Sequence, residues 1–90
     1  MQDITRQVTL ILKQYNIKKA ALFGSYARGD FDEKSDIDIL IQPPKGMGIE
    51  FISLKHELED KLGKKVDLVS YNGINKYRKP YILKYQKLIL

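Results

Sequence analysis

The sequence contains no cysteine and no tryptophan, and it has only three prolines and one histidine. The absence of cysteine excludes disulfide bonds and thiolate metal sites. The apolar runs, such as Leu10–Leu12, are too short to cross a bilayer, which takes about 20 consecutive apolar residues in a helix. The first residues show no cationic start followed by an apolar core, so we expect no export signal and a cytoplasmic location.

The 90 residues are 43% hydrophobic and 30% charged. The hydrophobic fraction is too high for a disordered chain. A chain of this length buries about 60–65% of its unfolded surface, which is enough for one modest core. We therefore expect a single soluble domain over residues 1–90 that meets any large substrate on an open face.

Charge is distributed unevenly along the chain. Residues 1–60 carry 8 basic and 10 acidic side chains, whereas residues 61–90 carry 8 basic ones and a single acid, Asp67. The positive C-terminal third could attract a nucleic acid, the phosphates of a nucleotide or an acidic protein. Charge alone does not choose among these partners, and a solvated basic surface has the same composition.

The spacing of apolar side chains predicts alternating helices and strands. The predicted elements are, in order, a helix ending near Asn16, a strand over 20–23, a turn or short helix over 24–29, a strand over 37–41, a helix around 51–62 capped by Gly63, a strand over 66–69, a turn at 72–73, a short helix with Pro80 in its first turn, and an edge strand over 87–90. This order favours an α/β fold, namely a small mixed β-sheet with helices packed on one face.

Two acidic residues, Asp36 and Asp38, flank Ile37 at the start of the predicted strand 37–41. Side chains alternate across a strand, so both carboxylates project from one face. At ~4 Å they repel each other by about 4 kcal/mol for an effective dielectric of 20. A bound cation or a shared proton relieves that repulsion. Oxygen ligands of this kind select a hard divalent ion, and Mg²⁺ is favoured where phosphates complete its shell.

Gly24 and Ser25 follow the buried strand 20–23 and precede a turn that contains Gly29. Glycine lets a backbone approach a phosphate closely, Ser25 offers a hydroxyl donor, and a following helix N-terminus favours an anion. The segment lacks the lysine of a Walker loop and the three glycines of a dinucleotide fingerprint. It is a candidate phosphate-binding turn, and an ordinary strand-to-helix turn would contain the same residues.

Asp67 lies between Val66 and Leu68 in the predicted strand 66–69. Alternation directs the two apolar side chains to the core and Asp67 to the opposite face. If this strand neighbours the strand over 37–41, three carboxylates converge. A solvent-exposed aspartate on an edge strand is equally consistent with the alternation.

Residues 24–30, Gly-Ser-Tyr-Ala-Arg-Gly-Asp, and residues 35–40, Ser-Asp-Ile-Asp-Ile-Leu, resemble the signature of the DNA polymerase β-like nucleotidyltransferase superfamily. Ten residues separate the Gly-Ser pair from the Asp-x-Asp pair, as in that signature. Residues 54–69 are similar to a helix and third strand of its minimal members, the MNT proteins, which are antitoxins paired with HEPN-domain toxins. The resemblance spans most of the chain and implies the palm-like nucleotidyltransferase fold.

The resemblance also implies roles for the three carboxylates. Asp36 and Asp38 would bind two Mg²⁺ ions that bridge the phosphates of a nucleoside triphosphate such as ATP. Asp67 would complete the metal site and help to deprotonate the acceptor hydroxyl.

Three further residues are implied to hold the nucleotide. Gly24 and Ser25 would bind its terminal phosphates, so that the α-phosphorus lies in line between the acceptor oxygen and the departing pyrophosphate. Arg28 would be a phosphate or carboxylate partner, and a structural ion pair with a nearby acid is an equally good interpretation.

The likeness to MNT proteins implies transfer of AMP from ATP to a hydroxyl, in particular to a tyrosine of a HEPN-domain toxin that is thereby silenced. Larger superfamily members select the base and the acceptor with additional domains, for which 90 residues leave no room. Two alternatives belong to other classes. One is a non-catalytic module that neutralises a HEPN partner by covering its surface, and the other is a nucleic-acid-binding module that acts through the basic C-terminal third.

Aromatic and basic side chains alternate near the C-terminus. Tyr77, Tyr81 and Tyr85 lie among lysines and one arginine, a pattern found where bases stack above phosphates. Their recurrence every four residues instead favours one side of a helix that packs on the sheet or on a partner. His56 lies off the apolar stripe of its predicted helix, so we expect it to be solvated.

Overall fold

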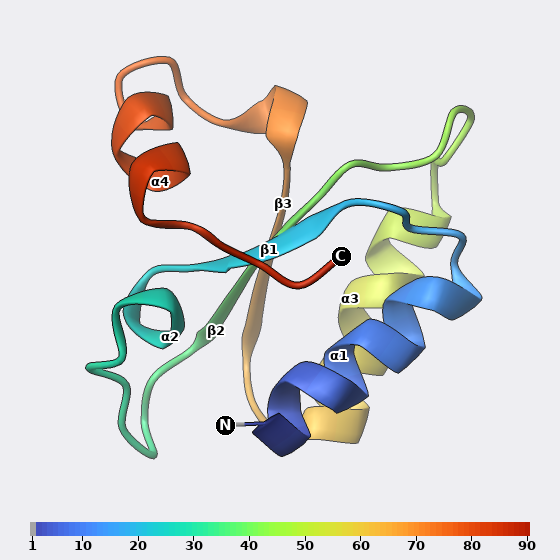
Figure 1. The fold of residues 1–90 in the computed structure, drawn as a ribbon. Coiled ribbons are helices and arrows are strands. Elements are labelled where there is room, and N and C mark those ends of the chain that lie inside the picture. Colours follow the sequence, from blue (N-terminus) through green and yellow to red (C-terminus); the bar gives the residue numbers. More distant parts are fainter. Residues whose placement is uncertain (1) are drawn as a thin grey trace.

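A four-stranded mixed β-sheet runs through the centre of the molecule (Figure 1). Its strands are β1 (Ala20–Phe23), β2 (Ile37–Ile41), β3 (Val66–Ser70) and β4 (Lys87–Leu88), and their order is β3-β2-β1-β4. Strand β1 is antiparallel to both β2 and β4, whereas β2 and β3 are parallel. The structure, a computed structural model, describes residues 2–90. The predicted small mixed sheet is confirmed.

Two long helices, α1 (Gln2–Gln14) and α3 (Glu50–Leu62), lie side by side on one face of this sheet (Figure 1). Helix α3 ends at Gly63, whose φ of 64° is in the left-handed region that favours glycine. It forms the crossover between β2 and β3, because parallel neighbours cannot be joined by a tight turn. No helix among the described residues is long and apolar enough to cross a membrane.

The main core lies between the sheet and these two helices. Alternation along β2 directs Ile37, Ile39 and Ile41 into it, and α3 contributes Leu54 and Leu58, all fully buried. His56, on the same helix, is exposed as expected. Asp38 therefore lies on the opposite face of β2 from these isoleucines.

A smaller core lies on the opposite face of the sheet. Three short helical segments, α2 (Ser25–Arg28), the 3₁₀ turn η1 (Tyr71–Gly73) and α4 (Lys79–Tyr85), complete the fold. Helix α4 contains Pro80 in its first turn, as predicted. It is anchored by Ile82, which joins Ala21, Phe23, Leu40 and Tyr71 in this second cluster. The phenol of Tyr71 also donates a hydrogen bond of 2.8 Å to Gln86, just after α4.

The structure differs from the sequence-based expectation near the C-terminus. Tyr77 precedes α4 and is 82% exposed, and Tyr81 and Tyr85 are exposed by 57% and 47%. These tyrosines therefore do not pack on the sheet, where Ile82 packs instead. Packing on a partner stays a prediction. The edge strand predicted over 87–90 is present as the two-residue β4, which pairs with β1.

Candidate active site

Strand register brings two of the three predicted carboxylates together. In the parallel pair of β2 and β3, Asp38 lies directly beside Asp67. In the antiparallel pair of β1 and β2, Phe23 lies beside Asp38. The turn that begins at Gly24 is therefore next to the same carboxylate. Asp67 is solvent-exposed on the edge strand β3 and at the same time neighbours Asp38. The two interpretations of this residue, an exposed edge-strand aspartate and a neighbour of the other carboxylates, are therefore compatible.

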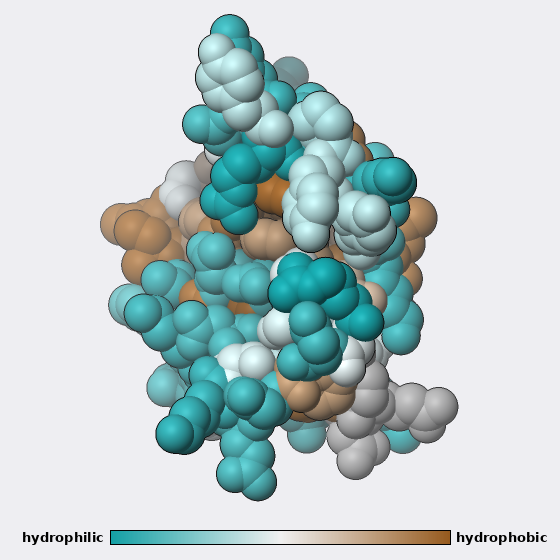
Figure 2. Space-filling model, turned by 90° about the vertical axis from the view of Figure 1, so that its left-hand side faces the viewer, coloured by the Kyte–Doolittle hydropathy of each residue, from teal (hydrophilic) through white to brown (hydrophobic). Residues whose placement is uncertain are grey.

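A cleft of about 460 Å³ opens at this end of the sheet. Figure 2 views the molecule from the side of α2 and α4, and it shows a mostly hydrophilic face with apolar atoms at the floor of a hollow. The cleft contains all six predicted site residues together with neighbours from β1, the loop before β2, and α4: Phe23, Gly24, Ser25, Arg28, Ser35, Asp36, Asp38, Asp67, Arg78, Tyr81, Ile82 and Tyr85. We refer to this set as the active-site cleft.

The electrostatics of the active-site cleft are strongest at Asp38. Partial burial, together with the neighbouring negative charges of Asp67 and Asp36, raises the pKa of its carboxyl group from the ordinary 3.8 to about 6. The positive charges of Arg28 and Arg78 act in the opposite direction. The carboxylates thus repel one another, and the cleft favours cations.

Gly24 makes an unusually close approach to this carboxylate. Its φ of 68° and ψ of −146° are accessible to glycine but rarely to other residues. A Cβ atom at this position would overlap the Oδ2 atom of Asp38. The turn between β1 and α2 is therefore restricted to glycine by both conformation and space, which an ordinary strand-to-helix turn does not require.

Arg28 has a partner of its own. Its Nε atom lies 3.3 Å from Oδ2 of Asp30, and both side chains are substantially exposed. The structural ion pair considered from the sequence is present. Arg28 also borders the active-site cleft, so the pair does not exclude a contact with phosphate.

Six residues of the active-site cleft are not among the predicted site residues, and three of these carry a cation or a phenol ring. Arg78, Tyr81 and Tyr85 come from the start and body of α4. Their spacing of three and four residues places them on one side of a helix, a signal present in the sequence. Their neighbours in space depend on how α4 docks, which the sequence pattern does not specify.

The donor set fits a divalent metal that binds together with a phosphate substrate. Within residues 2–90 no group of three or more acidic, histidine or cysteine side chains is arranged to hold a metal ion by itself. Nevertheless Asp36, Asp38 and Asp67 share one cleft and repel one another. Mg²⁺ is usually bound through one or two carboxylates while phosphates and waters supply its other ligands, so an incomplete protein site is what this chemistry needs.

Comparisons with known proteins agree with this geometry. Residues 6–90 match the family described as "Polymerase beta, Nucleotidyltransferase". A presumed protein adenylyltransferase of Methanocaldococcus jannaschii is 43% identical over 84 residues, which cover 92% of this chain and 90% of that protein. The match therefore extends over both chains almost completely.

Two solved structures share the fold. One, a presumed minimal nucleotidyltransferase, has a TM-score of 0.81 and 29% identity and covers 94% of this chain and 88% of its own. Another contains a tri-AMPylated HEPN toxin of Shewanella oneidensis in complex with an MNT antitoxin. It has a TM-score of 0.78 and 22% identity, and the match covers 99% of this chain and 71% of that chain. The carboxylate cleft, the glycine turn and the match over residues 6–90 together show that this chain belongs to the polymerase β-like nucleotidyltransferase family.

Proposed function

We propose that this chain is a Mg²⁺-dependent protein adenylyltransferase that moves AMP from ATP to a tyrosine hydroxyl of a HEPN-domain toxin and so acts as its antitoxin. The observation that carries the proposal is the active-site cleft, where the carboxylates of Asp36, Asp38 and Asp67 lie beside the glycine turn at Gly24 and Ser25.

The proposed reaction is a displacement at the α-phosphorus of ATP. The acceptor oxygen forms a new bond to this phosphorus, and the bond from phosphorus to the oxygen that bridges to the β-phosphate breaks. Pyrophosphate departs with that oxygen and its electron pair, and the hydroxyl proton passes to Asp67 or to solvent. Positioning and charge stabilisation supply most of the rate in such transfers, because this chain itself forms no covalent bond to the nucleotide.

The chain's own residues have distinct tasks in this scheme. Asp36 and Asp38 would hold two Mg²⁺ ions, with Asp67 completing the ligand set. When bound, the metal neutralises phosphate charge and makes the acceptor hydroxyl more acidic. Gly24 lets the backbone approach the terminal phosphates, and the Ser25 hydroxyl donates a hydrogen bond to them.

Two lines of support favour a protein acceptor. The related M. jannaschii protein is named for protein adenylyl transfer, and the S. oneidensis complex contains a HEPN toxin that carries AMP groups. In addition, the cleft lies at the surface of a small domain, and its acidic residues Asp36 and Asp67 are exposed. A partner protein can therefore bring an acceptor side chain to the carboxylates without entering a deep pocket.

The test is intact-mass spectrometry of a HEPN-domain partner after incubation with this protein, Mg²⁺ and each nucleoside triphosphate in turn. We expect a mass gain of adenylyl groups with ATP, lost in Asp36→Asn and after chelation of the metal. Asp60→Asn is the matched control, because Asp60 is exposed on α3 outside the active-site cleft and the substitution removes the same charge. Peptide mapping would then identify the modified residue.

A different outcome favours a non-catalytic antitoxin. If Asp36→Asn neutralises the toxin as well as the unmodified protein does at equal expression, transfer is not the mechanism of neutralisation. A stable complex without any mass gain would lead to the same conclusion.

A further inference from the structure

Helix α4 presents a cation and two aromatic rings to the active-site cleft. Arg78 at its N-terminal end, Tyr81 one turn later and Tyr85 another turn later all border the cleft. The same cleft is lined by Asp36, Asp38 and the glycine turn. One cleft therefore combines groups that suit phosphates with groups that suit a planar aromatic ring.

The position of α4 is set by contacts beneath it. Ile82 is 7% exposed and packs in the small core with Phe23 and Leu40. The hydrogen bond between Tyr71 and Gln86 holds the end of the helix. Because Phe23 directly precedes Gly24, the base of α4 rests on the same strand that leads into the phosphate-binding turn. This arrangement fixes Arg78 and Tyr81 relative to that turn.

Arg78 is available for an anion. Within the described part of the chain the one ion pair joins Arg28 to Asp30, so Arg78 has no such partner there. Its positive charge is close enough to Asp38 to lower the pKa of that carboxyl group. A guanidinium in this position can donate two hydrogen bonds to a phosphate, which is its preferred ligand geometry.

Tyr81 offers the more accessible aromatic face. The rings of Tyr81 and Tyr85 are 5.0 Å apart between centroids and tilted by 54°. The ammonium group of Lys84 lies 5.4 Å above the ring of Tyr85, which covers part of that ring. Tyr81 is 57% exposed and is supported from one side by Tyr85. Exposed aromatic rings beside phosphate-binding groups are a common platform for nucleobases.

We propose that α4 is the nucleotide-recognition wall of the active-site cleft, in which Arg78 binds the triphosphate and Tyr81 stacks on the base. This inference rests on the proposed function for the identity of the nucleotide. A nucleoside triphosphate satisfies both groups at once, because it joins an anion to a planar ring. An acceptor tyrosine would use the ring and leave Arg78 without an anionic partner.

The experiment measures binding of AMP-PNP to the whole protein by calorimetry in the presence of Mg²⁺, without any acceptor. We expect Arg78→Gln and Tyr81→Ala each to weaken binding about tenfold, a loss typical of removing one stacking ring or one phosphate contact. Tyr81→Phe should bind like the unmodified protein, because the ring is retained.

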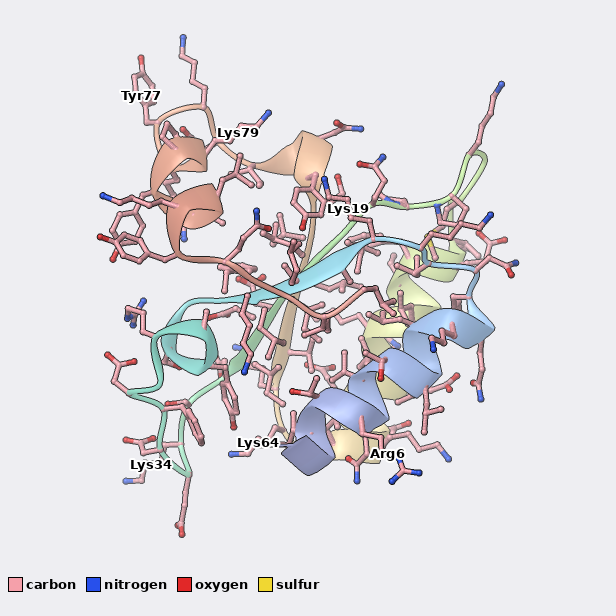
Figure 3. All side chains as sticks on the ribbon, in the orientation of Figure 1. Arg6, Lys19, Lys34, Lys64, Tyr77 and Lys79 are labelled. Atoms are coloured by element: carbon pink, nitrogen blue, oxygen red, sulfur yellow. The ribbon has the colours of Figure 1, made fainter. Side chains whose placement is uncertain are left out.

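Matched controls come from the same segment. Tyr77 and Lys79 point outward from the top of the molecule, away from α2 (Figure 3), and neither borders the active-site cleft. Tyr77→Ala and Lys79→Gln should leave AMP-PNP affinity within about twofold, because they remove a ring or a charge that does not face the nucleotide. Thermal melting of every variant establishes that α4 still docks.

Inorganic triphosphate separates the two contacts. It lacks a base, so Tyr81→Ala should bind it as well as the unmodified protein does, whereas Arg78→Gln should still bind it about tenfold more weakly. Unchanged AMP-PNP affinity in Tyr81→Ala, with a raised KM for the protein acceptor, would overturn the inference and make α4 an acceptor surface. If AMP-PNP binding follows the expected pattern but no partner is modified, the inference stands and the proposed function fails.

Discussion

Gly24 and Asp38 are so close that a Cβ atom on residue 24 would overlap the Oδ2 atom of the carboxylate. The turn proposed to hold phosphate and the carboxylate proposed to hold metal are therefore in direct contact. A displacement of one moves the other. A single methyl group added at residue 24 would therefore change the relative position of the turn and the carboxylate.

The first prediction concerns this contact. Gly24→Ala should reduce adenylyl transfer about 100-fold, because a shift of about 1 Å in a positioned group has an effect of this size. It should also destabilise the fold by about 1 kcal/mol or more, since alanine is strained at positive φ. Transfer kinetics and denaturant unfolding measure the two effects.

Gly29→Ala is the control for Gly24→Ala. Gly29 also has a positive φ, of 86°, but no atom lies within 4 Å of its hypothetical Cβ. We expect a similar loss of stability with little loss of transfer. Equal losses of transfer in both variants would show that backbone strain alone, rather than contact with Asp38, is responsible.

The second prediction concerns pH and stability in the metal-free protein. Burial and the charges of Asp67 and Asp36 raise the pKa of Asp38 to about 6 in the folded state, above its ordinary 3.8. The folded state therefore holds this proton more tightly, and stability falls as pH rises from about 4 to about 6. Because the Asp38 side chain is only partly buried, solvent screens these charges, and we expect a loss of only about 1 kcal/mol.

Asp38→Asn tests this effect. In the presence of a chelator, the variant should be more stable than the unmodified protein at pH 7 by about 1 kcal/mol, and the difference should vanish near pH 4. Denaturant unfolding across this range measures it, with Asp60→Asn as the exposed control. A variant that is less stable at pH 7 would contradict the raised pKa.

The third prediction separates the two roles of Arg28. Its ion pair with Asp30 is exposed, so Asp30→Asn should change the free energy of unfolding by less than about 0.5 kcal/mol. If Arg28 contacts phosphate, Arg28→Gln should weaken AMP-PNP binding several-fold while Asp30→Asn does not. Calorimetry on both variants makes the comparison. Unchanged affinity in Arg28→Gln would restrict Arg28 to its ion pair.

The fourth prediction compares two leucines on the helical face. Leu58 is fully buried between α3 and the sheet, whereas Leu10 on α1 is 55% exposed. Leu58→Ala should cost about 2–5 kcal/mol of stability, because it removes buried methyl groups and leaves a cavity. Leu10→Ala should cost less than about 1 kcal/mol. Similar losses at both sites, measured by urea unfolding, would contradict the assigned core.

Local patterns in the sequence were sufficient to predict most elements of the fold. Alternation along residues 37–41 correctly directs the isoleucines to one face and Asp38 to the other. Gly63 and Pro80 mark the end of one helix and the first turn of another. These signals depend on residues near one another in the chain, and the structure confirms them.

Local signals of this kind do not predict the order of the strands or the docking of α4. Alternation places Asp67 on the face of its strand that points away from the main core, but it does not indicate which strand is the neighbour. The position of Asp67 beside Asp38 follows only from the observed parallel register. The sequence pattern places Arg78 and Tyr81 only within a basic, aromatic segment. Their place in the active-site cleft depends on Ile82 packing in the small core, a contact between distant parts of the chain.

The parallel pairing of β2 with β3 also has a consequence for how the chain acquires activity. Asp36 and Asp38 precede the crossover helix α3, and Asp67 follows it. The three carboxylates therefore meet only after β2 has paired with β3, a pairing that joins residues further apart in the sequence than the β1–β2 pair does. Contacts of higher sequence separation form more slowly. A partly folded molecule with β1 and β2 already paired would lack the third carboxylate, so under the proposed function activity requires the β2–β3 pair as well.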